Sequence, residues 1–279
     1  MQPTVLTIAG SDSSGGAGIQ ADLKAIAACG GYGASVLTAI TAQNTRGVTS
    51  AEELASSIIR AQLDAVFDDL DVAACKTGML ASARVISVVA AVLQGRQPPH
   101  YVCDPVMISK SGYALLADDA VDALVAELLP RAALVTPNVH EAARLAGFPV
   151  RTIAHAHRAA RAIRDRGAAA VLVKGGHLTD RPGVDVLDSP DGVAVLETEW
   201  IDSRHTHGTG CTYSAAIATH LARGFDLEDA VRRSKRFLTE AIRAGLAVGH
   251  GTGPTDPFFF LRTPSDWTST LADEGPRSR

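Results

Sequence analysis

Residues 4–31, TVLTIAGSDSSGGAGIQADLKAIAACGG, contain the unit that decides the fold. Residues 5–9 form a short and almost wholly apolar run, which is typical of a buried strand. A loop rich in Gly and Ser follows, and residues 18–29 then show a helical pattern that Gly30 and Gly31 end. We therefore predict a strand, a polar loop and a helix in direct succession.

The same succession continues along the chain. The further predicted strands are 35–41, 72–75, 101–103, 134–136 and 170–173, and the predicted helices are 52–67, 82–94, 118–129, 139–146, 155–166, 210–223 and 227–247. Residues 184–188 and 193–199 predict a hairpin around Ser-Pro-Asp-Gly. Continuous apolar strands are covered on both faces of a sheet, so we expect an α/β fold with a mostly parallel central sheet.

Composition limits the partners of this chain. Of its 279 residues, 46% are apolar and 20% are charged, which suits a globular protein with a sizeable core. Only 5% are aromatic, and the formal net charge is -4. We therefore expect no nucleic-acid partner and no anionic membrane partner, because neither a basic surface nor stacking side chains are plentiful. An anionic ligand needs positive groups gathered at one place.

Neither a Pro/Ser-rich linker nor a block of like charges divides the chain. We predict one domain over residues 1–262, followed by a polar tail over 263–279. The four cysteines are far apart and form no CxxC pair, which argues against a zinc site or a disulfide framework. With no signal sequence and no run of about 18 apolar residues in view, the expected compartment is the cytoplasm.

Polar and glycine residues follow the predicted strands. Open parallel sheets bind ligands at the carboxyl ends of their strands. The loops in question begin at Gly10, Gln43, Lys76, Asp104, Pro137 and Lys174. Any one glycine-rich loop is ordinary, but six of them at one sheet edge predict a ligand site.

Residues 16–21, GAGIQA, match the G-x-G-x-x-A pattern of a dinucleotide site. Two features argue against an NAD-linked oxidoreductase, which remains an alternative on this match alone. The loop before Gly16 is longer than the tight turn of such sites, and the second strand is not followed by the acid that binds a ribose. The P-loop pattern is absent from the sequence as well.

Residues 207–212, HGTGCT, form the strongest single motif, at the start of a predicted helix. Exposed backbone N–H groups between two glycines, together with the helix dipole, would bind an anion there. Cys211 lies in the first turn, where the pKa of a thiol can fall from about 8.5 to between about 3.5 and about 7.5. A base or nucleophile is one interpretation, and a small buried residue at the helix start is the other.

Three further polar residues allow both a structural and a functional interpretation. Glu141, three residues after Asn138, completes the spacing of a capping box, but its carboxylate could also reach a magnesium ion. Asp104 follows a strand and is either a turn residue or a second acid. Lys174 is either a snorkelling lysine or a cation for phosphate oxygens. His205 and His207 lack an evident third ligand, which argues against a histidine metal site.

Seven segments, taken together and in this order, resemble one known family. They are AGSDSSGGAGIQADLKA, TAQNTRGV, KTGML, DPVMISKSG, TPNVHEA, VLVKGGH and THGTGCTYSAA. The chain resembles hydroxymethylpyrimidine (phosphomethylpyrimidine) kinase of thiamin biosynthesis from about residue 4 to residue 262. The resemblance implies a ribokinase-like three-layer α/β/α sandwich, a homodimer, and phosphorylation of 4-amino-5-hydroxymethyl-2-methylpyrimidine and then of its monophosphate, with ATP and Mg²⁺.

The resemblance also implies roles at the phosphoryl end of the site. The loop of Gly208, Thr209, Gly210 and Cys211 matches the family's anion hole, with Cys211 as base or polariser of the accepting oxygen. Glu141 and Asp104 match acids near the metal ion. The groups that match contacts to nucleotide and phosphate are Lys174, Thr209 and Asn138.

At the pyrimidine end, the matching positions are Gly10, Asp22, Gln43 and Met79, and residues 108–112 resemble a flap. The nearest rival is a pyridoxal or pyridoxine kinase of the same fold. Gln43 and Asn44 favour an aminopyrimidine, because a side-chain amide can pair with a ring nitrogen and an exocyclic amine together. A non-catalytic binding module is the alternative from another class, and the presence of Lys174, Glu141 and Cys211 argues against it.

Overall fold

The computed structural model describes residues 2–109, 112–117 and 119–261, and within them one sheet holds nine strands. Their order is β3-β2-β1-β4-β5-β6-β7-β8-β9. The strands are β1 (Thr4–Asp12), β2 (Tyr32–Asn44), β3 (Gly47–Glu53), β4 (Val72–Thr77), β5 (His100–Cys103), β6 (Leu134–Val135), β7 (Val171–Val173), β8 (Asp185–Ser189) and β9 (Gly192–Leu196). Strands β2, β1, β4, β5, β6 and β7 are parallel, while β3 at one end and β8 and β9 at the other are antiparallel.

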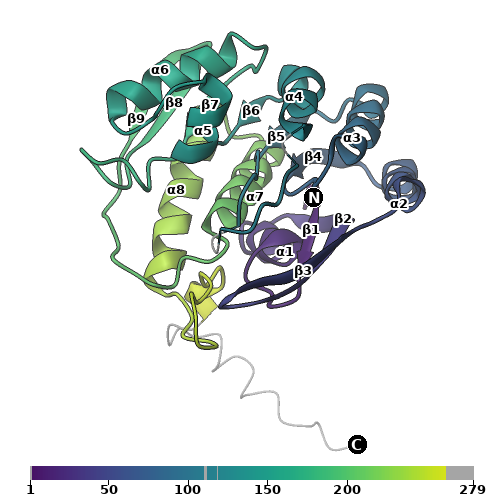
Figure 1. Cartoon of the computed structure of the whole chain (residues 1–279), viewed down its shortest axis with the longest axis horizontal. Helices are drawn as coiled ribbons and strands as arrows, with labels where there is room; N and C mark the ends of the chain where they lie inside the picture. Colours follow the sequence, from purple (N-terminus) through teal and green to yellow (C-terminus); the bar gives the residue numbers. More distant parts are fainter. Residues whose placement is uncertain (1, 110–111, 118, 262–279) are drawn as a thin grey trace, which may run out of the picture.

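Helices cover both faces of this sheet (Figure 1). On one face lie α1 (Gly18–Ala28), α7 (Thr209–Ala222) and α8 (Leu227–Arg243), and on the other lie α2 (Ser56–Asp69), α3 (Ala83–Arg96), α4 (Ala120–Ala123), α5 (Val139–Ala146) and α6 (Ile153–Arg164). Short π- and 3₁₀-helical turns, Leu124–Leu128, Leu129–Arg131 and Phe259–Leu261, complete the helical elements. Each layer has its own apolar core against the sheet. The predicted three-layer fold with a mostly parallel sheet is confirmed.

The antiparallel strand β3 is the element that differs most from the sequence prediction. A helix was predicted over residues 52–67, but residues 52 and 53 belong to β3 and the helix begins at Ser56. The sequence of β3, GVTSAEE, is polar because the strand lies at the sheet edge, where half of its side chains face solvent. Glu53 pairs with Ala39 of β2 and forms an ion pair with Arg84 of α3. Edge pairing therefore outweighs the helical pattern there.

Two features of the fold position the site. The parallel strands end at one edge of the sheet, so the loops after β1, β4, β5, β6 and β7 meet there. Helix α7 packs against β1, β4 and β5 and begins at the same edge. The single domain over residues 1–262 stays a prediction, and its residue 262 and the predicted tail lie outside the described residues.

The described part of the chain contains no helix that is both long enough and apolar enough to cross a membrane.

His220, near the end of α7, predicts a pH dependence of stability. Its ring is buried against Phe225, with ring centroids 5.6 Å apart, and its Nδ1 has no hydrogen-bond partner among the described residues. Burial and the nearby Arg223 and Arg233 lower the pKa of His220 from 6.5 to about 4. The unfolded chain therefore binds a proton more readily, and stability falls as the pH drops from about 6.5 towards about 4.

We expect the free energy of unfolding to fall by about 2–3 kcal/mol from this group between pH 7 and pH 4.5. The substitution His220→Phe keeps an aromatic ring against Phe225 and removes the titrating group. Urea unfolding at both pH values should show a smaller pH dependence in the variant. The same dependence in both proteins would contradict the assignment.

Candidate active site

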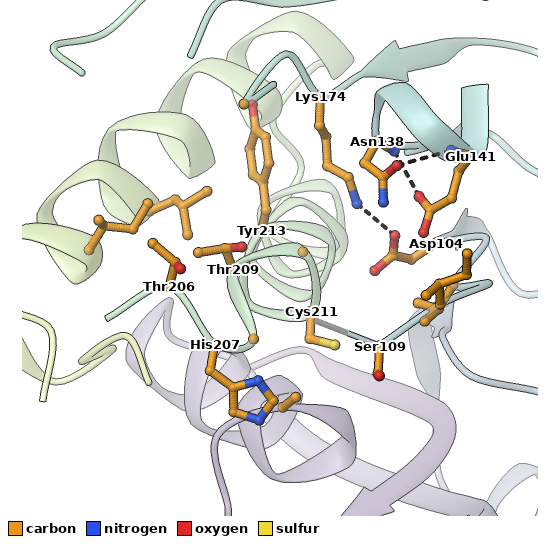
Figure 2. Close-up of a pocket in the computed structure, with 18 of the residues that line it drawn as sticks. Asp104, Ser109, Asn138, Glu141, Lys174, Thr206, His207, Thr209, Cys211 and Tyr213 are labelled. Atoms are coloured by element: carbon orange, nitrogen blue, oxygen red, sulfur yellow. Dashed lines mark hydrogen bonds and ion pairs between the residues drawn. The ribbon is translucent and has the colours of Figure 1, made fainter. Parts of the chain in front are cut away.

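A cavity of about 780 Å³ opens at the carboxyl ends of the strands. Its size is typical of sites for nucleotides and other small molecules. With one exception, Asp22, every residue predicted from the sequence lines it (Figure 2). These are Gly10, Gln43, Met79, Asp104, Asn138, Glu141, Lys174, Gly208, Thr209, Gly210 and Cys211. The fold thus gathers seven separate segments of the chain around one space.

Helix α7 begins at the cavity without a side-chain cap. Gly208 precedes the helix with φ of 77°, and a Cβ atom there would lie 1.8 Å from the carbonyl oxygen of Gly16, so only glycine fits. A glycine cannot cap the helix with a side chain, unlike Ser82, Asn138, Thr152 and Asp226 at α3, α5, α6 and α8. The Thr209 N–H donates to the Thr206 carbonyl at 3.4 Å, while the N–H groups of Gly210 and Cys211 are available to an anion.

Cys211 lies in this first turn and faces the cavity (Figure 2). Burial raises the pKa of its thiol to about 12, although Lys76 and a hydrogen bond from the Gly18 backbone act in the opposite direction. Of the two interpretations that the sequence left open, the raised pKa disfavours Cys211 as a base. The desolvation of a charged thiolate outweighs the helix dipole, so Cys211 is a neutral thiol near pH 7.

Lys174 and Asp104 form an ion pair beside the start of α7. The Nζ–Oδ1 distance is 2.8 Å, and Ser214 of α7 donates to the other carboxylate oxygen at 3.1 Å. Burial alone would raise the pKa of Asp104, but Lys174 and Lys76 lower it. A side chain on Gly210 would lie 3.2 Å from the Lys174 Nζ. The lysine is thus held against the helix start, as a cation for phosphate oxygens requires.

Glu141 proves to be both a capping residue and a neighbour of this ion pair. Its Oε2 accepts from the backbone N–H of Asn138 at 2.7 Å, and the Asn138 side chain accepts from the N–H groups of His140 and Glu141. This confirms the capping box at α5. Burial and the nearby Asp104 raise the pKa of Glu141 to about 7, although Lys174 opposes them. A partly protonated carboxyl group therefore faces the cavity.

The donor set fits a magnesium ion that also binds phosphate. Mg²⁺ in phosphoryl-transfer sites is held by one or two carboxylates together with substrate oxygens and water. Asp104 and Glu141 supply two such carboxylates on one wall of the cavity. Among the described residues, no group of three or more His, Cys, Asp or Glu could hold a metal by itself. The chain alone thus offers a half-built site that phosphate oxygens would complete.

The glycine-rich loop after β1 is closed by a carboxylate of the chain itself. Asp12 accepts from the backbone N–H groups of Ser14, Gly16 and Ala17 at 2.8, 3.2 and 2.8 Å, and from His207 Nε2 at 2.8 Å. Burial opposes this charge, but the hydrogen bonds from His207 and Ser14 lower the pKa of Asp12 to about 2. An internal anion thus occupies the place that a dinucleotide phosphate would need, which argues against the NAD alternative.

Asp22 lies beneath the cavity instead of in its lining. Its two carboxylate oxygens accept from Lys76 Nζ at 2.9 and 2.8 Å, and from the Thr7 hydroxyl at 2.6 Å. Both charged side chains are fully buried. Burial opposes the charge of Lys76, but Asp22 raises its pKa, so the lysine stays protonated. The structure thus places Asp22 as the partner of an internal cation and brings it into no contact with the cavity.

Sequence reasoning missed a second buried cluster at the other side of the cavity. Asp185 of β8 accepts from Lys235 at 2.7 Å, from Tyr213 at 3.1 Å and from the Gly175 N–H at 2.9 Å. These bonds join β8, α7, α8 and the loop after β7. The available signal was a charged residue, Asp185, directly before the apolar pair Val186 and Leu187. Of the predicted flap, Ile108, Ser109 and Gly112 line the cavity, while residues 110 and 111 lie outside the described residues.

Comparisons with known proteins show the family to which this chain belongs. A family model described as phosphomethylpyrimidine kinase matches residues 12–256. The chain belongs to the phosphomethylpyrimidine kinase family. A hydroxymethylpyrimidine/phosphomethylpyrimidine kinase of Rhizobium meliloti (strain 1021) is 51% identical over 261 residues, which cover 92% of this chain and 98% of that protein.

Solved structures agree with the family assignment and confirm the ribokinase-like fold. A phosphomethylpyrimidine kinase from Clostridium difficile 630 is 45% identical, with a TM-score of 0.77 over 86% of this chain and 100% of that chain. An ADP complex of pyridoxal kinase from Bacillus subtilis is 38% identical, with a TM-score of 0.88 over 94% and 100%. Shape alone therefore does not separate the two kinds of kinase.

The buried pair of Lys76 and Asp22 predicts a large and asymmetric effect on stability. Lys76→Met leaves a carboxylate without its cation in an environment without water, so we expect the free energy of unfolding to fall by about 3–5 kcal/mol. The double variant Lys76→Met/Asp22→Leu removes both charges and should recover most of this loss. Urea unfolding of the three proteins measures both effects. A double variant no more stable than Lys76→Met would contradict the pairing.

Proposed function

We propose that this chain transfers the γ-phosphoryl group of ATP to 4-amino-5-hydroxymethyl-2-methylpyrimidine and then to its monophosphate, in thiamin biosynthesis. Membership of the phosphomethylpyrimidine kinase family confirms the predicted phosphotransferase class. One observation carries the mechanism. The uncapped start of α7 lies beside the Lys174–Asp104 pair, in the same cavity that Gln43 and Met79 line.

The phosphoryl end of the cavity has the groups that this reaction needs. Phosphoryl transfer depends mainly on positioning and on neutralising charge at the transferred group. Gly210 and Cys211 offer the backbone N–H groups of the helix start, Thr209 lies beside them with its hydroxyl group, and Lys174 offers an ammonium group. A structural relative binds ADP, which supports a nucleotide in this cavity.

Asp104 and Glu141 are proposed to hold Mg²⁺, with Asn138 keeping Glu141 in place through the capping box. The metal ion would neutralise negative charge on the phosphates. Before nucleotide binds, Lys174 neutralises Asp104 directly at 2.8 Å. When nucleotide binds, Lys174 would turn from the Asp104 carboxylate to a phosphate oxygen. The acid would then be paired with Mg²⁺, so it is neutralised with and without nucleotide.

Cys211 is proposed to orient and polarise the accepting oxygen. Since burial raises the pKa of its thiol to about 12, the group is protonated near pH 7 and is unsuited to removing a proton. Its sulfur can still accept a weak hydrogen bond from the hydroxymethyl group. At the second step the acceptor is a phosphate, which is already ionised and needs less help.

The pyrimidine end is proposed to consist of Gly10, Gln43 and Met79. A Cβ atom on Gly10 would lie 2.9 Å from the Met79 sulfur, so glycine leaves room for the thioether and the ring together. Asp22 is proposed to act on the site indirectly, by pairing with Lys76 beneath the cavity. A cytoplasmic location and a homodimer stay predictions, which fractionation of cells and analytical ultracentrifugation would test.

A coupled ATPase assay tests the proposed activity. With ATP and Mg²⁺, we expect turnover of the pyrimidine alcohol and of its monophosphate to the diphosphate, both lost on removal of Mg²⁺ by EDTA. Pyridoxine is the matched comparison, because the TM-score to a pyridoxal kinase is the higher of the two reported above. Faster turnover of pyridoxine at the same concentration would reverse the assignment.

Replacement of Cys211 separates the two phosphorylation steps. Cys211→Ala should lower kcat for the alcohol by about tenfold to a hundredfold, the effect of losing a functional hydrogen bond, and for the monophosphate by less than about threefold. Cys211→Ser keeps an acceptor atom and should recover part of the activity. The idea fails if Cys211→Ala slows both steps equally, as measured with purified alcohol and monophosphate.

A further inference from the structure

Gln43 has two hydrogen-bonding ends, and each meets a fixed partner. One end lies 3.3 Å from His207 Nε2 and the other lies 3.1 Å from Thr41 Oγ1. The oxygen and the NH₂ group of a side-chain amide have nearly the same shape, so the surrounding hydrogen bonds decide which end is which. With the NH₂ group toward His207 and the oxygen toward Thr41, both ends are in conflict.

At the His207 end, two donors would face each other. The Asp12 carboxylate accepts three backbone N–H groups and the Ser14 hydroxyl, and its Oδ2 lies 2.8 Å from His207 Nε2. A carboxylate with so many donors is ionised, so His207 Nε2 must carry the hydrogen of this bond. A ring nitrogen that donates cannot also accept from an NH₂ group. The ring N–H repels an NH₂ group and attracts a carbonyl oxygen, so the end of Gln43 beside it is the carbonyl oxygen, although the Nε2 hydrogen itself is given to Asp12.

At the Thr41 end, one hydrogen would have to serve two acceptors. The Thr41 hydroxyl lies 2.9 Å from the carbonyl oxygen of Ser11, which can only accept. The single hydroxyl hydrogen is therefore committed to Ser11, and Thr41 Oγ1 is left to accept. The facing end of Gln43 must be the NH₂ group. Two independent contacts thus require the same orientation.

We propose that Asp12 and His207 are positioning residues that lock the Gln43 amide, carbonyl toward His207 and NH₂ toward Thr41. The locked amide selects an acceptor ring that carries a hydrogen-bond acceptor and an amino donor side by side. This inference deepens the proposed function and rests on it. It assigns substrate specificity to a buried hydrogen bond, from His207 to Asp12, that links the loop after β1 to the loop before α7.

The chemistry of the two rival rings explains the selection. The locked amide keeps one N–H and one oxygen lone pair for a ligand. A 4-aminopyrimidine offers ring nitrogen and amino group in adjacent positions, so both bonds form. Pyridoxal offers a hydroxyl beside an aldehyde, and the aldehyde oxygen only accepts. Against a locked carbonyl, that oxygen is repelled, whereas an amide that flips freely would accommodate both rings.

Variants at both ends of the amide test the proposal. His207→Phe removes the donor, while His207→Gln replaces it with an N–H at a similar reach. Thr41→Val removes the acceptor without touching the Asp12–His207 pair, and Thr41→Ser keeps it. For each protein, kcat/KM is measured with the pyrimidine alcohol and with pyridoxal. Titration calorimetry with both rings gives the same ratio of affinities without turnover.

We expect His207→Phe and Thr41→Val each to lower kcat/KM for the pyrimidine by about tenfold to a hundredfold, chiefly through KM. Pyridoxal should change by less than about threefold, so the selectivity ratio falls by about tenfold or more. His207→Gln and Thr41→Ser should restore the ratio. Equal losses for both rings, in turnover or in binding, would overturn the locked amide.

The proposed function and this inference fail in different ways. A wild-type protein that binds the pyrimidine but phosphorylates neither the alcohol nor its monophosphate refutes the kinase proposal. A selectivity ratio that is the same in wild type, His207→Phe and Thr41→Val refutes the locked amide, whatever the activity.

Discussion

The carboxylate of Asp12 holds the two glycine-rich loops of the site together, and the geometry of the cavity depends on this bond. Its charge binds the backbone of residues 14–17 on one side and His207 on the other. With the loops so close, Gly208 touches the Gly16 carbonyl, and α7 starts where no side chain can cap it. An internal anion thus shapes the place where an external anion binds.

The buried lysines of this site are each paired with an acid. The chain has a net charge of -4, and yet we propose that it binds several phosphate groups. Lys76 pairs with Asp22, Lys174 with Asp104, and Lys235 with Asp185, all with little or no exposure to solvent. Asp22 raises the pKa of Lys76, and Asp104 raises the pKa of Lys174. Positive charge is therefore stored inside the protein near the ligand, and a basic surface is unnecessary.

The sequence predicted the fold and eleven of the residues that line the cavity, because both follow from local patterns. Apolar runs and glycine loops mark the strands and the edge at which they end, so Lys174, Asp104 and the loop at 208–211 were found. The sequence placed Asp22 in the pocket and left the state of Cys211 open for one reason. A motif gives the neighbours of a residue along the chain, but its pKa and its contacts depend on desolvation and on groups such as Lys76 that approach from other strands. The polar strand β3 was hidden by acidic residues that suit a helix as well.

Glu141 has two roles in one carboxyl group. It closes the capping box of α5 and faces the cavity beside Asp104. A glutamine there could still accept from the Asn138 N–H, because a capping box takes Glu or Gln, but it would bring no negative charge to the cavity. A smaller or apolar residue would lose both roles at once. In a population of variants, position 141 should tolerate fewer residue types than the exposed positions of the same helix, even where kinase activity is only weakly selected.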